Sequence, residues 1–499
     1  MSLHAQLSPE AQQRLSAQKR TSTLTSLLIA ILLMVLIGLI LMIVAIASIT
    51  KFVPPYTVYS GTDETDSDPK LKKVQTSIQS KPSPPSLSMS KVIVVNSESP
   101  VAVPVPDFPT PDPSSNIGDG NDFGEGWGQG TGTGPGGPAG RIPTKFRKRC
   151  SKEDRISRLT ESGGTPACED AVVSSLRWLK STQSPDGSWT NRPTSMTGLA
   201  LLAYLGHCET AGSAEFGETV LRAITFLVNK SMKNNGKLAD DLNEKHWPYE
   251  HAIATYALAE AYTLCVKTFQ ENIPNLEEAV MDAGQFLINS QHQSGGWDYG
   301  YSEDSTRGGD VSIVGWHMQA LKACQYTGLD FANLRKCYKK GIDYLKRMQS
   351  ADGALGYSSP NGLHGDGTTL AAVGALCFQI WDDAANREAR KAVKFMDRKM
   401  NFAWNTPDAD LYGHYYAVQA MINHGGKTWE KYNSMFRDEV LNNQSQDGSF
   451  KDLGGGQKVN AVGASFVGNS AMAKHYRTCL ATLMLESYYR FLPSAGGGK

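Results

Sequence analysis

One pattern recurs four times in the C-terminal two-thirds of this chain: an amphipathic stretch that carries Gln near its end and then turns at Gly. The copies are LKSTQSPDGSW at 179–189, LINSQHQSGGW at 287–297, LKRMQSADGAL at 345–355 and LNNQSQDGSF at 441–450. Glycine supplies the left-handed conformation that ends a helix, and glutamine can satisfy carbonyls left over there. Repetition of this kind predicts an architecture of similar units packed side by side.

Helices of two kinds are expected around these turns, six of each. The apolar, small-residue-rich set is Thr194–Cys208, Tyr249–Cys265, Val311–Tyr326, Thr368–Ile380, Leu411–Asn423 and His475–Phe491. The amphipathic set is Ala171–Thr182, Thr219–Asn229, Glu277–Ser290, Leu334–Met348, Glu388–Lys399 and Trp429–Asn442. Two concentric rings bury both kinds, with the apolar set inside. The predicted fold is therefore all-α, an (α/α)6 toroid over residues 148–493, followed by a flexible tail at 494–499.

The N-terminal region predicts a membrane anchor. Residues 27–49 form a run of 23 residues without a charge, long enough to cross roughly 30 Å of hydrocarbon as a helix. Arg14, Lys19 and Arg20 precede the run, which favours a cytoplasmic N-terminus. We expect a cytoplasmic tail at 1–23 and one transmembrane signal-anchor helix at 24–50 in the cytoplasmic (inner) membrane. The toroid would then lie outside the cytoplasm, in the periplasm of a two-membrane cell. The alternative to an anchor is a signal peptide that is cleaved off.

Residues 51–147 are rich in Pro, Ser and Gly, a composition that cannot build a core. This stretch is predicted to be a disordered linker that holds the toroid away from the membrane. A segment that binds a protein partner is the alternative.

Charge and cysteine content exclude some functions. Lysine plus arginine balance aspartate plus glutamate, 49 against 49, which gives no electrostatic reason to expect nucleic acid. None of the eight cysteines forms a C-x-x-C pair, so neither a zinc finger nor a disulfide framework is indicated. An occasional bridge remains open if the compartment is oxidising.

The Gln–Gly–Trp turns resemble the repeats of squalene and oxidosqualene cyclases, within the prenyltransferase and squalene-cyclase repeat group. The match is fullest at Gln183-Gly187-Trp189 and Gln291-Gly295-Trp297, and the closing LATLMLESYYRFLP at 480–493 resembles the last helix of bacterial repeat proteins of this group. The resemblance covers roughly residues 174–493. It implies a terpenoid-cyclase-like toroid, a fold that also serves protein prenyltransferases and non-enzymatic proteins.

The resemblance also defines what catalysis would need. The cyclases protonate their substrate with an Asp-x-Asp-Asp-Thr stretch at the start of an inner helix, and here Asp310-Val311-Ser312 keeps only the first Asp. Zinc-dependent prenyltransferases need Asp and Cys two residues apart, plus a His near the last inner helix; Ser312 and Arg477 occupy those places. No metal or other cofactor is therefore expected. Asp310 is the leading candidate for a catalytic acid, and Asp366 and His251 are the alternatives for a rearranged site.

Aromatic and polar residues at the expected helix starts are candidates for a ligand-binding lining. Aromatic rings suit an apolar or isoprenoid ligand through burial and π contact. The alternative is that these residues serve packing and that the aspartates cap helices. The candidates are His251, Trp297, Tyr301, Trp316, Asp366, Trp404, Tyr412, His414 and Tyr415. Asp310, Asp366 and Asp410 each stand just before an expected inner helix.

Three functions compete. The first is a membrane-anchored toroid that binds an apolar or isoprenoid ligand, or a protein segment, without the usual catalysis of the group. The second is an isoprenoid-active cyclase or transferase with a rearranged acid. The third is an adaptor that spans the cell envelope and binds a protein partner through its linker.

Overall fold

The computed structural model describes residues 149–301, 307–363, 365–381, 386–454 and 463–490, all within the compact unit Val105–Lys499. Regular structure in these ranges is helical, and the only β pairings there are two isolated bridges inside the Gln–Gly turns, Gln349 with Leu355 and Gln444 with Phe450. The predicted tail at 1–23, anchor at 24–50, linker at 51–147 and tail at 494–499 lie outside the described residues.

No helix within the described ranges combines the length and the apolar composition that a membrane crossing requires.

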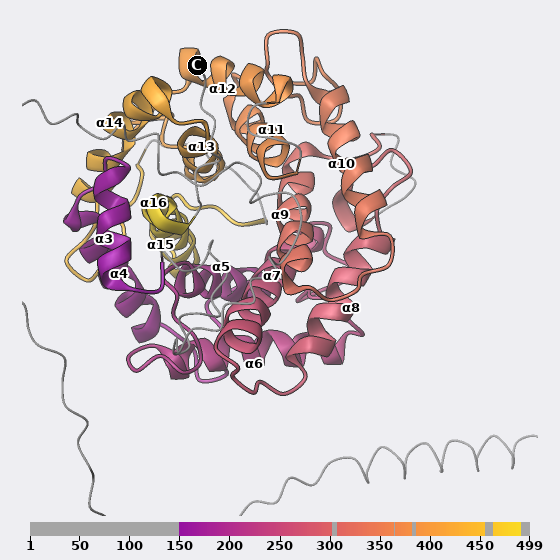
Figure 1. The fold of residues 1–499 in the computed structure, drawn as a ribbon, viewed down its shortest axis with the longest axis vertical. Helices are drawn as coiled ribbons and strands as arrows, with labels where there is room; N and C mark the ends of the chain where they lie inside the picture. The colour runs from indigo at the N-terminus through magenta and orange to yellow at the C-terminus, as the bar shows by residue number, and fades with distance from the viewer. Residues whose placement is uncertain (1–148, 302–306, 364, 382–385, 455–462, 491–499) are drawn as a thin grey trace, which may run out of the picture. The chain divides into compact units, whose positions relative to one another are not determined.

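Six helices form a closed inner ring (Figure 1). They are α5 (Pro193–Gly206), α7 (Trp247–Ala261), α9 (Val311–Thr327), α11 (Thr368–Trp381), α13 (Leu411–His424) and α15 (Ala471–Leu485). Each contacts the next, and α15 packs back against α5. Every residue of α7 is buried. Such helices belong in an interior position, because a helix without a polar stripe has no face to offer to water.

Six amphipathic helices surround the inner ring. They are α4 (Pro166–Ser181), α6 (Gly217–Lys233), α8 (Leu276–Asn289), α10 (Leu334–Met348), α12 (Arg387–Lys399) and α14 (Gly426–Asn442). The predicted double ring is confirmed for the described residues, and every predicted helix has a counterpart. Additional elements are α3 (Lys152–Glu161), the π-helix η3 (Tyr262–Thr268), the 3-10 turn η4 (Tyr299–Tyr301) and α16 (Ser487–Arg490).

The glutamines of the repeated turns join neighbouring outer helices. Gln183 donates from Nε2 to its own turn at Gly187 O and to Thr219 O on α6, both at 3.0 Å. Gln291 similarly reaches Gly295 O at 2.9 Å and Cys337 O on α10 at 2.8 Å. Each amide therefore connects the end of one outer helix to the start of the next. Gln349 and Gln444 make the corresponding bonds to Glu388 O and Ala171 O.

The turn glycines bring the backbones equally close. A Cβ on Gly187 would overlap Arg222 O of α6, and one on Gly448 would overlap Ser174 O of α4. Both glycines have positive φ, near +90°, a conformation costly for any other residue. The repeat motif thus specifies how outer helices pack, in addition to where they end.

The chain enters the toroid through a disulfide. Cys150 is bonded to Cys208, with Cα atoms 5.0 Å apart, immediately after α5. The other six cysteines are free and buried. Spacing in the sequence did not indicate this pairing, because the two cysteines are brought together only by the tertiary fold.

Candidate functional site

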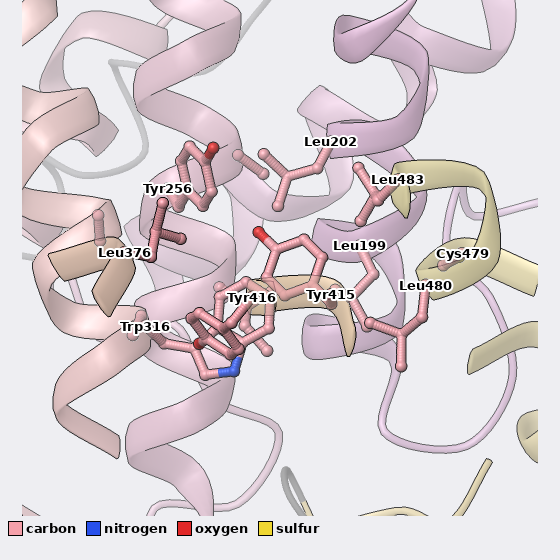
Figure 2. Close-up of a cluster of buried hydrophobic side chains, with 14 of the residues drawn as sticks. Leu199, Leu202, Tyr256, Trp316, Leu376, Tyr415, Tyr416, Cys479, Leu480 and Leu483 are labelled. Carbon is pink, nitrogen blue, oxygen red and sulfur yellow. The ribbon is translucent and has the colours of Figure 1, made fainter. Parts of the chain in front are cut away.

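All six inner helices contribute buried side chains to one cluster at the centre of the ring (Figure 2). Aromatic residues come from α7, α9 and α13, and leucines come from α5, α11 and α15. Labelled members include Leu199, Leu202, Tyr256, Trp316, Leu376, Tyr415, Tyr416, Cys479, Leu480 and Leu483. We call this set the central cluster. Two predicted ligand-binding residues, Trp316 and Tyr415, belong to it.

Trp316 and Tyr415 form a stacked aromatic pair within the central cluster. Their rings stack with centroids 5.1 Å apart and an interplanar angle of 16°. Tyr415 Oη accepts a hydrogen bond from Gln319 Nε2 at 3.1 Å. Burial raises the pKa of Tyr415 far above its ordinary value, so the phenol stays neutral and can donate a hydrogen bond.

Several buried polar atoms of the inner ring lack a hydrogen-bond partner among the described residues, including Thr197 Oγ1, Thr255 Oγ1 and Tyr416 Oη. Trp316 Nε1 on α9 and Tyr476 Oη on α15 are two more, and both side chains are fully buried. Buried N–H and O–H groups are nearly always satisfied, because an unmet donor costs about 1–3 kcal/mol. The two groups could therefore receive an acceptor atom from a bound molecule.

Asp310 lies at the N-terminal mouth of the inner ring, completely buried. It caps α9 by accepting from Ser312 N at 2.9 Å, accepts from the Ser312 hydroxyl, and pairs with Arg307 at 2.7 Å. Arg307 also reaches Asp298 at 3.2 Å. Burial raises the pKa of Asp310 to about 6, while the bonds from Ser312 and the charge of Arg307 oppose that rise. The predicted capping role is therefore present, together with an ion pair.

Hydroxyl groups continue from Asp310 toward the surface. The Ser312 hydroxyl is 2.7 Å from Tyr249 Oη, which lies 3.5 Å from Tyr299 Oη on a half-buried side chain. Tyr412, a predicted ligand-binding residue on α13, donates from its hydroxyl to Ser312 O at 2.9 Å. It thereby bridges α13 to α9 across the mouth.

Four predicted ligand-binding residues are not among the labelled members of the central cluster. His251 donates from Nε2 to Ala283 O of α8 at 3.1 Å and accepts from Leu238 N; burial lowers its pKa to about 3, so it is neutral. Trp297 donates from Nε1 to Leu287 O at 3.0 Å. Tyr301 Oη is 2.8 Å from His317 Nε2, and Trp404 donates to Asp452 O at 3.2 Å. The polar atoms of these side chains are occupied by the protein itself.

Asp366 and His414 line a small polar pocket at the rim, about 50 Å³ in volume, together with Asp408 and Asp410. Asp366 caps α11 through Thr368 N at 2.9 Å. Asp410 instead accepts from the hydroxyl of Thr369 on α11, at 2.6 Å. His414 is held by Tyr432 Oη at 2.7 Å, and burial lowers its pKa to about 4. Asp310 is not among the residues that line this pocket.

An unpredicted charge cluster lies at the C-terminal end of the inner ring. Arg490 pairs with Glu260 at 2.7 Å and donates to Leu202 O at 2.8 Å. Arg149 also pairs with Glu260, at 2.9 Å. Glu486 lies 3.5 Å from Arg490, and burial raises its pKa to about 8 although the charge of Arg490 opposes that rise. Sequence patterns gave no signal for these contacts, which join residues from both ends of the toroid.

Among the described residues, no group of three or more His, Cys, Asp or Glu side chains is placed to hold a metal ion. Arg477, at the position where the resemblance to zinc-dependent prenyltransferases would place a histidine, donates to the carbonyl oxygens of Phe450 and Gly468, at 2.8 and 2.6 Å.

No family model matches the chain, and no curated protein does. Solved structures of the type II terpene cyclase MstE from Scytonema are similar to it. A variant of that enzyme with its substrate geranylgeranyl dihydroxybenzoate gives a TM-score of 0.43 at 13% identity, covering 65% of this chain and 98% of that one. The apo enzyme gives 0.42 at 13% identity, covering 66% and 99%. Likenesses this distant assign no activity and no residue's role to this chain.

Proposed function

We propose that this chain displays a binding toroid outside the cytoplasm, anchored by its N-terminal apolar run. The inner ring takes an apolar ligand of the lipid or isoprenoid class that carries one hydrogen-bond acceptor. It does so without acid catalysis.

The observation that carries this proposal is that two of the unmet donors, Trp316 Nε1 and Tyr476 Oη, lie in an apolar surrounding. A hydrocarbon chain placed among the leucines and rings of the central cluster gains roughly 25 cal/mol for each Å² of apolar surface that it buries. An oxygen at its end would satisfy Trp316 Nε1 or Tyr476 Oη, which otherwise remain unpaired among the described residues. The labelled members of the cluster are uncharged, which suits a neutral ligand, and the nearby Arg490, which donates to Tyr256 Oη at 3.3 Å, is paired with Glu260.

The surroundings of Asp310 support binding in place of protonation. A general acid has to hold its proton until the substrate arrives. Here Arg307 and two donor groups of Ser312 all favour the ionised carboxylate. In the Asp-x-Asp-Asp-Thr stretch of the cyclases that this sequence resembles, Ser312 takes the place of the second aspartate and offers no further acid.

The disulfide supports the proposed location. Cys150–Cys208 is a bond of the kind that persists in oxidising compartments and is rare in the cytosol. This agrees with the topology expected from Arg14, Lys19 and Arg20.

The test is direct recovery of the ligand. The segment 147–499, purified from its native host, is extracted with organic solvent and compared by mass spectrometry with a mock purification. We expect one enriched lipid or isoprenoid species at up to equimolar amount. Identical extracts would contradict the proposal and favour an adaptor that binds a protein segment.

Acid catalysis is the second candidate, favoured by one observation. Burial brings the pKa of Asp310 to about 6, and the hydroxyls of Ser312, Tyr249 and Tyr299 connect it to the surface. Turnover of a polyprenyl substrate that Asp310→Asn abolishes would establish it.

A further inference from the structure

Two outer helices carry a concentrated positive charge. The basic residues of α10 are Arg335, Lys336, Lys339, Lys340, Lys346 and Arg347, against Asp343 alone. Those of α12 are Arg387, Arg390, Lys391, Lys394, Arg398 and Lys399, against Glu388 and Asp397. All twelve basic side chains are exposed or half-buried. We call them the basic face.

The two helices are neighbours in the outer ring. Gln349, just after α10, donates to Glu388 O of α12 at 2.9 Å. The same turn places Gly353 directly against Lys391 O of α12. Both helices also pack on α11. The charges of α10 and α12 therefore belong to one continuous sector of the toroid.

This concentration is specific to the sector. The whole chain has 49 basic and 49 acidic residues, so the basic face is not a consequence of a basic protein. The outer helix α8 shows the contrast, since it carries Glu277, Glu278 and Asp282 and no Lys or Arg.

Helix electrostatics explain only part of the basic face. Lys346, Arg347, Arg398 and Lys399 lie in last turns, where the helix dipole favours cations. Other basic residues, including Arg335, Lys336 and Arg387, lie in first turns, where the dipole disfavours them. Asp397 of α12 pairs with Lys431 of α14 at 3.1 Å, so its charge does not offset the basic residues of α12.

We propose that the basic face binds the anionic headgroups of a lipid bilayer, and that the toroid lies with α10 and α12 against the membrane. This inference rests on the proposed anchoring of the chain. The apolar run 27–49 would hold the toroid near one bilayer, and a Pro- and Gly-rich linker of this length lets a domain reach that surface. Clustered Lys and Arg near an anionic bilayer each strengthen association roughly fivefold. The attraction acts within about 8 Å at physiological salt.

The experiment measures lysine accessibility in the full-length chain. The protein is placed in nanodiscs of neutral phosphatidylcholine, or of the same lipid with about one-third phosphatidylglycerol, and acetylated briefly. Mass spectrometry then reports Lys336, Lys339 and Lys394 on the basic face. Lys152 on α3 and Lys233 on α6, both exposed, are the controls.

We expect the three basic-face lysines to react about fivefold more slowly in anionic discs than in neutral ones, with the difference removed by high salt. The control lysines should react equally in both. The triple variant Lys336→Glu/Lys339→Glu/Lys394→Glu should remove the protection of Lys340 and Lys391. The variant Lys152→Glu/Lys233→Glu should leave it intact.

Equal reactivity in both lipids would overturn the proposal. So would protection that is independent of lipid charge but lost when residues 107–125 are deleted, since that stretch is acidic and contains no Lys or Arg. Anchoring is tested separately, by resistance to alkaline extraction. If the chain is extracted, added anionic vesicles should still protect the basic face, so the two failures are distinguishable.

Discussion

Gln444 donates from Nε2 to the carbonyl oxygen of Ala171 at 2.8 Å, across a separation of 273 residues. The same amide reaches Gly448 O of its own turn at 3.1 Å. Gln183 and Gln291 make the same pair of bonds between successive outer helices. The same kind of Gln–Gly turn that joins successive outer helices therefore also closes the ring, because the last turn binds back to α4.

Substitution of Gly448 by Ala should weaken this closure. Gly448 has φ +90° and its added Cβ would overlap Ser174 O, whereas Gly468 has φ +100° and no atom within 4 Å. Both variants bear the cost of a positive φ, about 1 kcal/mol, but only Gly448→Ala also forces α4 away. We expect Gly448→Ala to lower the free energy of unfolding by about 3 kcal/mol or more, and Gly468→Ala by about 1 kcal/mol. Denaturant titration checks this, and equal losses of unfolding free energy in the two variants would contradict the role of the last turn in closing the ring.

Loss of the disulfide should destabilise the toroid at its entry. Cys150 and Cys208 enclose a loop with a sequence separation of 58, and bonds of this kind contribute about 2–4 kcal/mol. The variant Cys150→Ser/Cys208→Ser should show that loss and then be insensitive to reductant, whereas the natural chain should lose the same amount when reduced. Cys377→Ser, at a free buried cysteine, keeps the response to reductant. If the natural chain is equally stable with and without reductant, the disulfide does not contribute this stability.

Glu486 should make stability fall as pH rises. Its pKa is raised from 4.5 to about 8 in the folded chain, so between those pH values the native state holds a proton that the unfolded state has released. Stability from this group is thus full below about pH 4.5 and is lost as pH rises to about 8. Glu486→Gln should remove the loss, and its stability relative to the natural chain should increase from pH 5 to pH 8. Unfolding midpoints at pH 5, 6.5 and 8 test this; a difference independent of pH would contradict it.

The sequence predicted the ring, whereas the structure distributes the predicted lining residues over different parts of it. Periodicity and the Gln–Gly turns located all twelve ring helices, because an amphipathic outer helix and an apolar inner helix differ in composition. That difference does not show which side of an inner helix faces the centre, since α7 is buried on every side. Trp297, in the turn after α8, was predicted as a lining residue, but its indole N–H is bound to Leu287 O. Trp316 on α9 lies in the central cluster.

Other features depend on contacts between distant segments. Arg149 meets Glu260, and Arg490 meets the same carboxylate from the other end of the toroid. No local pattern marks such a pair. The basic face was hidden for a different reason: a balanced total charge conceals the uneven distribution that becomes visible once α10 and α12 lie side by side.

The most direct test of the account is ligand retention in three matched variants of segment 147–499, measured by solvent extraction and mass spectrometry. If the inner ring binds an apolar ligand through Trp316 Nε1 and Tyr476 Oη, Trp316→Phe/Tyr476→Phe should reduce the recovered ligand at least tenfold. Asp310→Asn should retain it, because asparagine still caps α9. Trp404→Phe, which loses the indole bond to Asp452 O, should retain it as well. Undiminished ligand in Trp316→Phe/Tyr476→Phe, or turnover that disappears with Asp310→Asn, would contradict the proposed function.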